Sequence, residues 1–116
     1  MATAGGASVL LAGCSTIVNG VNVEVQNEDT QPHTVEITAV SSEGKTLVEK
    51  SPRIEPSRDA FYENVLPEFD TENPYQVTAS LENGTSNTVT PEMSEITEVW
   101  FEIRSPNELV GSVTAP

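Results

Sequence analysis

Hydrophobic and polar residues alternate with a period of two along most of this chain. Val21, Val23 and Val25, for example, share one side of an extended segment and have polar residues between them. This is the period of a β-strand with one buried face, and the 3.6-residue period of an amphipathic helix is nearly absent. The alternation predicts seven short strands, at 21–25, 34–39, 46–50, 60–66, 75–82, 85–90 and 97–103.

The face that each segment buries follows from the same alternation. At 97–103 the apolar residues occupy one face, and Trp100 is therefore expected on the other. At 60–66 the pattern leaves two inner faces open, one with Phe61 and Val65 and the other with Tyr62 and Leu66.

Turn signals separate the predicted strands. Asn83-Gly84 tolerates the positive φ values of a type I′ turn, and Gly44 within 42–45 indicates a second hairpin. Polar or proline-containing stretches at 27–32, 52–56 and 91–96 predict loops, and 108–113 adds a fragment of strand. Because no segment offers a crossover helix, we expect an all-β chain, a single antiparallel β-sandwich of about seven strands.

A short apolar stretch precedes the only cysteine. Residues 2–13 are uncharged and end in Leu-Ala-Gly directly before Cys14. This stretch resembles a lipobox, in which small residues let a signal peptidase cut before a cysteine whose thiol accepts a lipid. The alternative is a free or buried cysteine at the end of a first strand. A transmembrane helix is not expected, because it needs about 20 apolar residues.

The lipobox interpretation divides the chain into three parts. These are a processing segment at 1–13, Cys14 with a tether at 14–20, and a folded domain at 21–116. A secretory signal also needs positive charge before its apolar region, and no charged residue precedes Cys14. We therefore expect Met1 to be an internal start. The segment resembles the leaders of haloarchaeal lipoproteins, and this resemblance implies a pair of arginines encoded upstream.

Acidic residues dominate the charge. There are 18 Asp and Glu against 5 Lys and Arg, which gives a net charge of -13. Such self-repulsion is relieved at molar salt, where the Debye length falls to about 3 Å, so the composition favours a halophilic protein over an acidic mesophilic one. Nucleic acid is excluded as a partner, since phosphate binding needs clustered basic residues.

The order of these features resembles a known group of proteins. Thr-Val-Glu-Ile-Thr at 34–38, Pro-Glu-Phe at 67–69, Tyr-Gln-Val-Thr-Ala at 75–79 and the Asn-Gly turn are similar to the immunoglobulin-like domains of small haloarchaeal lipoproteins. The resemblance implies an extracellular domain anchored to the cell membrane through a lipid on Cys14. It carries over no other functional residue, because its motifs are strand and turn patterns.

Few residues suggest catalysis or metal binding. His33 is the only histidine, and without a Gly-x-Ser-x-Gly motif we expect a surface or strand-edge residue that takes no part in catalysis. A blue-copper site needs two histidines and fails on ligand count. Carboxylates that could surround a hard cation occur at 68–72, as Glu68, Asp70 and Glu72, and in the first loop, as Glu28 and Asp29. The run at 68–72 lacks the glycine and regular spacing of a calcium loop, so solvated acidic loops are expected and no metal site is assigned.

Two further features are candidates for modification or contact. Asn83-Gly84-Thr85 is a glycosylation sequon at an expected hairpin tip, although Asn-Gly is also simply a good turn. Trp100 and Tyr62 could form an aromatic contact patch, or they could belong to the core and the sheet edge.

The sequence thus favours a non-enzymatic cell-surface lipoprotein without a cofactor. Its sandwich is expected to act as an adhesion, scaffold or accessory module for a surface protein or glycan. The alternative is a secreted carrier that binds a small ligand or a divalent cation through its acidic loops.

Overall fold

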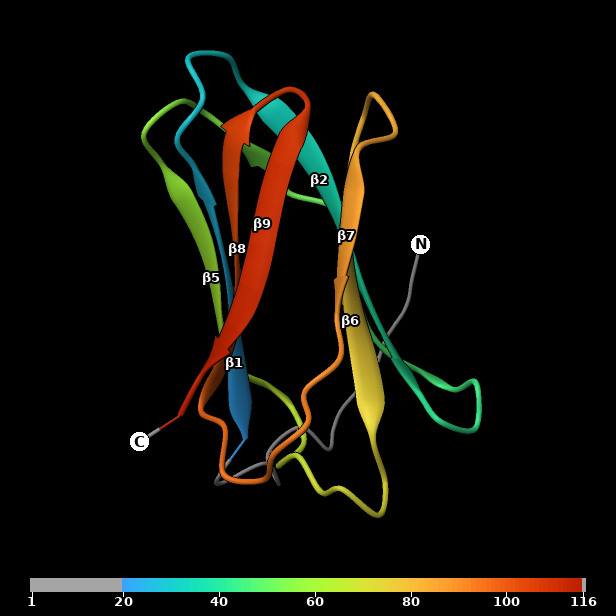
Figure 1. Ribbon diagram of the computed structural model, residues 1–116. Helices are drawn as coiled ribbons and strands as arrows, with labels where there is room; N and C mark the ends of the chain where they lie inside the picture. Colours follow the sequence, from blue (N-terminus) through green and yellow to red (C-terminus); the bar gives the residue numbers. More distant parts are fainter. Residues whose placement is uncertain (1–19, 116) are drawn as a thin grey trace.

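The computed structural model describes residues 20–115, which form two facing β-sheets (Figure 1). The expected all-β sandwich is confirmed. The described residues contain nine strands: β1 (Val21–Asn27), β2 (His33–Ser41), β3 (Thr46–Lys50), β4 (Arg53–Ile54), β5 (Asp59–Leu66), β6 (Tyr75–Leu81), β7 (Ser86–Val89), β8 (Glu98–Ser105) and β9 (Glu108–Thr114).

The strand count exceeds the expected seven because of β4 and β9. β4 lies where only a linker was expected, and its Ile54 is buried opposite His33 in a short antiparallel pair with β2. β9 is a full strand rather than a fragment, since it pairs with β8 along nearly its whole length. Neither strand has a long alternating pattern, and each is stabilised by its pairing partner.

One sheet has the order β5-β1-β8-β9, and the other has the order β3-β2-β6-β7 with β4 paired to β2. β1 runs parallel to β8, so this pair departs from the antiparallel pattern expected throughout. The starts of β1 and β8 consequently lie at the same end of the sandwich, together with the loops at 67–74 and 90–97 (Figure 1).

The core lies between the two sheets and follows the alternation in the sequence. Val21, Val23 and Val25 are buried as expected, and each contributes roughly 1.5–3 kcal/mol relative to an exposed side chain. The open question about β5 is decided in favour of Tyr62 and Leu66, but a register shift in the β1–β5 pairing also lets Val65 pack against the core. Tyr62 and Leu66 face the valines of β1, whereas Phe61 points away from the core and is 51% exposed.

Both expected hairpins form, but neither has a type I′ turn. In the β6–β7 hairpin the amide of Gly84 donates to the carbonyl of Leu81 (3.0 Å), and only Gly84, not Asn83, has a positive φ. The β2–β3 hairpin repeats this geometry at Gly44. Each is a type I turn followed by a glycine in the left-handed region. This arrangement connects strands through a three-residue loop, whereas a type I′ turn connects them through a two-residue loop.

Side chains join the two sheets where β7 approaches β9. The amide of Asn87 donates to the carbonyl of Leu109 (2.9 Å). Gly111 permits the close approach, because a Cβ there would lie 2.7 Å from the Phe101 ring and 2.8 Å from Val89. The contact therefore requires the absence of a side chain at this position.

Candidate functional site

His33 occupies the first position of β2, where a strand was expected to begin, but it is not a surface residue. Its side chain is only 4% exposed and lies between two carboxylates. Nε2 is 2.7 Å from Asp29 Oδ2, and Nδ1 is 2.8 Å from Glu82 Oε2. We call Asp29, His33 and Glu82 the His33 bridge. It links the β1–β2 loop, β2 and the β6–β7 turn.

Backbone amides and a buried asparagine hold the two carboxylates in place. Asp29 Oδ1 accepts from the amide of Thr30 (2.7 Å), and Glu82 Oε1 accepts from the amide of Thr34 (2.7 Å). Asn27, which is fully buried, accepts from the amide of Asp29 and donates to the carbonyls of Gln31 and Ile54. The loop expected to be a solvated acidic one is therefore partly ordered by its own side chains.

Each ionisable group of the His33 bridge stabilises the charged form of its neighbours. Burial alone would lower the pKa of His33, but the hydrogen bonds to Asp29 and Glu82 outweigh it, so the pKa is raised. The hydrogen bond from His33 lowers the pKa of Asp29. Burial works against the ionised form of Glu82, yet the bonds from His33 and Thr34 lower its pKa as well. The bridge thus favours an imidazolium between two carboxylates.

A second group of acidic residues lies on the outer face of the four-stranded sheet. Alternation directs these side chains away from the core, and strand register puts Phe61 and Trp100 on either side of Glu24. One rung further along, Asp59, Gln26 and Glu102 lie side by side in the same way. We define the outer acidic face as Asn22, Glu24, Gln26, Asp59, Phe61, Glu98, Trp100 and Glu102.

Glu24 is the residue most perturbed by this crowding. Burial, hydrogen bonding with Asp59 and Glu98, and the charge of Glu98 together raise the pKa of Glu24 to about 7. Desolvation and like charges both disfavour the ionised form of a carboxyl group, which accounts for the direction. An open hollow of about 330 Å³ adjoins this part of the face and is lined by Glu24, Gln26, Glu28, Ser57, Arg58 and Asp59.

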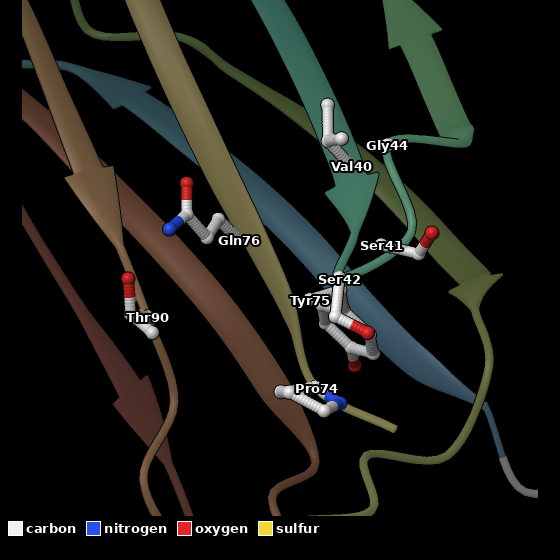
Figure 2. A pocket seen from close by; sticks show the side chains of 8 residues that line it. All are labelled: Val40, Ser41, Ser42, Gly44, Pro74, Tyr75, Gln76 and Thr90. Atoms are coloured by element: carbon white, nitrogen blue, oxygen red, sulfur yellow. The ribbon is translucent and has the colours of Figure 1, made fainter.

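The hollow shown in Figure 2 lies at the β2–β3 hairpin and the start of β6. It is open, has a volume of about 320 Å³, and presents hydroxyl and amide groups from Ser41, Ser42, Gln76 and Thr90 beside Pro74 and Tyr75. The phenol of Tyr75 donates to the carbonyl of Pro67 (3.0 Å), and burial raises its pKa. This hollow brings together polar groups but no carboxylate, so it is not formed by the acidic loops that the carrier alternative requires.

The acidic run at 68–72 is only partly assembled. Glu68 and Asp70 line an open hollow of about 410 Å³ together with Glu95, which was not anticipated, and Glu72 is not among the lining residues. Asp70 Oδ1 instead accepts from the amide of Glu72 (2.9 Å) and shapes a turn. Within residues 20–115, no three His, Cys, Asp or Glu residues lie in an arrangement that could hold a metal ion.

The sequon at Asn83 has a structural use. Its Nδ2 donates to the carbonyl of Pro106 (2.7 Å), and its Oδ1 accepts from the amide of Thr85 (2.9 Å). The hydroxyl of Thr85 donates to the same Pro106 carbonyl (2.9 Å). Asn83 is exposed, so glycosylation remains a prediction, but the side chain already joins the β6–β7 turn to the β8–β9 turn.

The suggested patch of Trp100 and Tyr62 does not form. The two side chains lie on opposite faces of the four-stranded sheet, since Tyr62 packs against the core, with the Lys50 ammonium 5.5 Å from its ring centroid. Phe61, which the sequence left undecided, shares the outer face with Trp100. Cys14 lies outside the described residues. In the described part of the chain, no helix is long and apolar enough to cross a membrane.

Neither a protein-family model nor a curated protein matches this sequence. Among solved structures, it is similar to an NMR structure of a protein from Eubacterium rectale, with 11% sequence identity and a TM-score of 0.46. The match covers 90% of this chain and 97% of that chain. A likeness of this extent says nothing about function.

Proposed function

We propose that this chain is a non-enzymatic lipoprotein of the cell surface, whose sandwich serves as an adhesion, scaffold or accessory binding module. The observation that carries the proposal is the state of the only histidine. Both ring nitrogens of His33 are hydrogen-bonded to carboxylates, so neither is free to accept a proton from a nucleophile. The most versatile acid–base group of the chain therefore has a structural role.

Anchoring rests on the residues around Cys14 and on where the folded strands begin. β1 starts at Val21, seven positions after Cys14. This end of the sandwich also carries the loops at 67–74 and 90–97 (Figure 1). In the proposed arrangement it faces the membrane, and the His33 bridge at the opposite end faces away from the cell.

The test is to express Cys14→Ser in the native host. The variant is expected to leave the membrane fraction for the medium, or to stall in processing, while its far-UV circular dichroism spectrum stays that of a β-sandwich. Thr16→Ser is the matched control and should remain with the membrane. Mass spectrometry of the native protein is decisive, because an intact Met1 with an unmodified thiol would end the lipoprotein proposal.

The carrier alternative is supported by one observation, the position of Glu68, Asp70 and Glu95 around a single open hollow, although the three carboxylates do not lie in an arrangement that could already hold a metal ion. Calcium titration by calorimetry separates it from the surface module. Saturable calcium binding that is lost in Asp70→Asn would favour the carrier, provided that it is kept in Glu36→Gln, a change in β2 that does not touch this hollow. If the titration gives only heats of dilution, the carrier alternative is excluded.

A further inference from the structure

The outer acidic face combines exposed aromatic surface with acidic side chains in one regular array. Phe61 is half exposed although it occupies a strand, and Trp100 lies two strands away on the same rung. Adjacent strands are separated by about 4.8 Å, so the backbone positions of the two residues are roughly 10 Å apart, with Glu24 between them. The core uses none of these side chains, because all three point away from it.

Most of the negative charges on this face are not compensated within the described residues. Ion pairs there join Arg104 to Glu102 and to Glu108, whereas Glu24, Asp59 and Glu98 have no basic group within 4 Å. Arg58 lines the adjoining hollow but does not reach ion-pair distance. A cation brought to Glu24 would therefore relieve like-charge crowding that the fold itself leaves in place.

We propose that the outer acidic face binds an extended segment of another protein that carries lysine or arginine at every second position. The segment lies along β1, with its cationic side chains over Phe61 and Trp100 and paired with Glu24, Asp59 and Glu98. The proposal rests on the function of the domain as a binding module and names the chemistry of its partner.

Two geometric facts favour this occupant. Alternate side chains of an extended chain repeat every 6.8 Å or so, which is also the spacing of Asn22, Glu24 and Gln26 along β1. Aromatic rings attract lysine and arginine within about 6 Å of the ring centroid, and the rings here lie beside carboxylates. A second copy of this chain is disfavoured, since each copy has a net charge of -13 and would bring the same carboxylates face to face.

The molecule carries its own reporter for the test. Trp100 is the only tryptophan, so its fluorescence reports on this face alone. The probe is a decapeptide of alternating lysine and threonine, titrated at the lowest salt at which the full chain keeps its folded spectrum. The same peptide with acetylated lysines is the control, since acetylation removes the charge and keeps the length. Saturable quenching or a spectral shift is expected with the first peptide only.

A pair of variants of equal charge separates this face from the acidity of the whole molecule. Glu24→Gln with Glu98→Gln is expected to weaken binding roughly fivefold, from two partly exposed ion pairs. Glu36→Gln with Glu49→Gln removes the same charge from the outer side of the other sheet and should leave affinity unchanged. Phe61→Ser should also weaken binding, and its exposure means that folding is preserved.

Binding should also depend on pH in a way that general acidity would not produce. The carboxyl of Glu24 faces Asp59 from β5 and Glu98 from β8, with Arg58 and Glu28 at the rim of the hollow, and its pKa is raised to about 7. A cation favours the ionised form, so affinity should rise between pH 6 and pH 8. Glu24→Gln should abolish this rise.

Several outcomes would overturn the proposal. Equal loss in the two double variants would mean attraction to net charge, and equally tight binding of spermidine would indicate a small polyamine instead of a protein segment. If the chain dimerises without the peptide, and Glu24→Gln strengthens the dimer, the occupant of this face is a second copy of the chain. If the fluorescence of Trp100 does not respond to the peptide, the peptide site is refuted, but the proposed lipid anchor on Cys14 is not affected. If Cys14 is found unmodified, the anchor is refuted, but the result of the peptide titration still stands.

Discussion

Two groups of carboxylates in this sandwich differ in whether a positive charge lies among them. In the His33 bridge, Asp29 and Glu82 enclose an imidazole that is almost completely buried, and the pKa of each carboxyl is lowered. On the outer acidic face, Glu24 has other carboxyls as neighbours, and its pKa is raised to about 7. The same side-chain type therefore stabilises the fold at one end and opposes it on one face.

The comparison shows that acidity by itself does not determine what a carboxylate does. Burial penalises the ionised form in both groups, and the sign of the result depends on the nearest charge. The His33 bridge is a closed set of partners and ties three segments together. The carboxylates of the outer acidic face mostly lack a basic partner within the described residues, so a positively charged segment can pair with them there and not at the bridge.

The largest expected effect comes from breaking the bridge. His33→Ala should lower the free energy of unfolding by about 2 kcal/mol at pH 6, because it leaves the mostly buried Asp29 and the half-exposed Glu82 without their cation. Urea unfolding followed by circular dichroism measures it. His33→Gln keeps one donor and should cost clearly less. A loss below about 1 kcal/mol for the alanine variant would mean that the bridge contributes no more than an exposed ion pair.

Neutralising Glu24 should act in the opposite direction. Glu24→Gln is expected to raise the free energy of unfolding by about 1 kcal/mol at pH 8, a value reduced for the solvent that reaches this face. The stability that the proton on Glu24 provides is fully present below pH 4.5 and is lost as the pH rises through about 7. The gain from Glu24→Gln should therefore be smaller at pH 5 and vanish at pH 4. Glu36→Gln on the other sheet is the control and should change little at any of these pH values. A destabilising Glu24→Gln would contradict the assigned crowding.

The protonation of His33 can be followed directly, since its imidazole is the only one in the chain. NMR titration is expected to give a pKa above the ordinary value of 6.5, and Glu82→Gln should bring it down. The stabilisation from His33 is fully present below pH 6.5 and is lost as the pH rises through its folded pKa. The carboxylates lose theirs as the pH falls through their lowered values. A pKa at or below 6.5 would mean that burial outweighs the two hydrogen bonds.

The smallest expected effect is a difference in salt response. Wild-type stability should rise from low to molar NaCl, because screening over about 3 Å relieves repulsion among the acidic groups. Glu24→Gln should flatten this rise by a few tenths of a kcal/mol, whereas His33→Gln should not. Thermal midpoints at several salt concentrations are sufficient. A wild-type midpoint that stays flat or falls would count against adaptation to salt.

Local patterns predicted most of the strands. Val21, Val23 and Val25 lie inward as their alternation indicates, and Trp100 lies outward. β4 and the full length of β9 escaped prediction because they form through pairing with β2 and β8. The turn type at Gly84 also escaped, since the hydrogen bond from the amide of Leu81 to the carbonyl of Thr85 closes a three-residue loop, whereas a type I′ turn serves a two-residue loop.

The candidate sites were harder to predict than the fold. His33 and Asp29 are four positions apart and both stand out in the sequence, but no local pattern connects them to Glu82, 49 positions from His33. The outer acidic face depends on the register of three strands, including a parallel pair that no local signal indicates. The sequence left the buried face of β5 undecided, and this was a possible signal of the outer aromatic surface. If Tyr62 and Leu66 are in the core, alternation places Phe61 on the outer face.

The sequence by itself determined the all-β class, most of the strand positions and the excess of negative charge, since alternation and composition are local or additive properties. Only the tertiary structure decided which carboxylates acquire a cation and which are crowded together. Electrostatic interactions fall off with distance and depend on burial, and both are set by strand order and register. Asp29 and Glu24 differ little as residues, yet the fold brings His33 to one and Glu98 to the other.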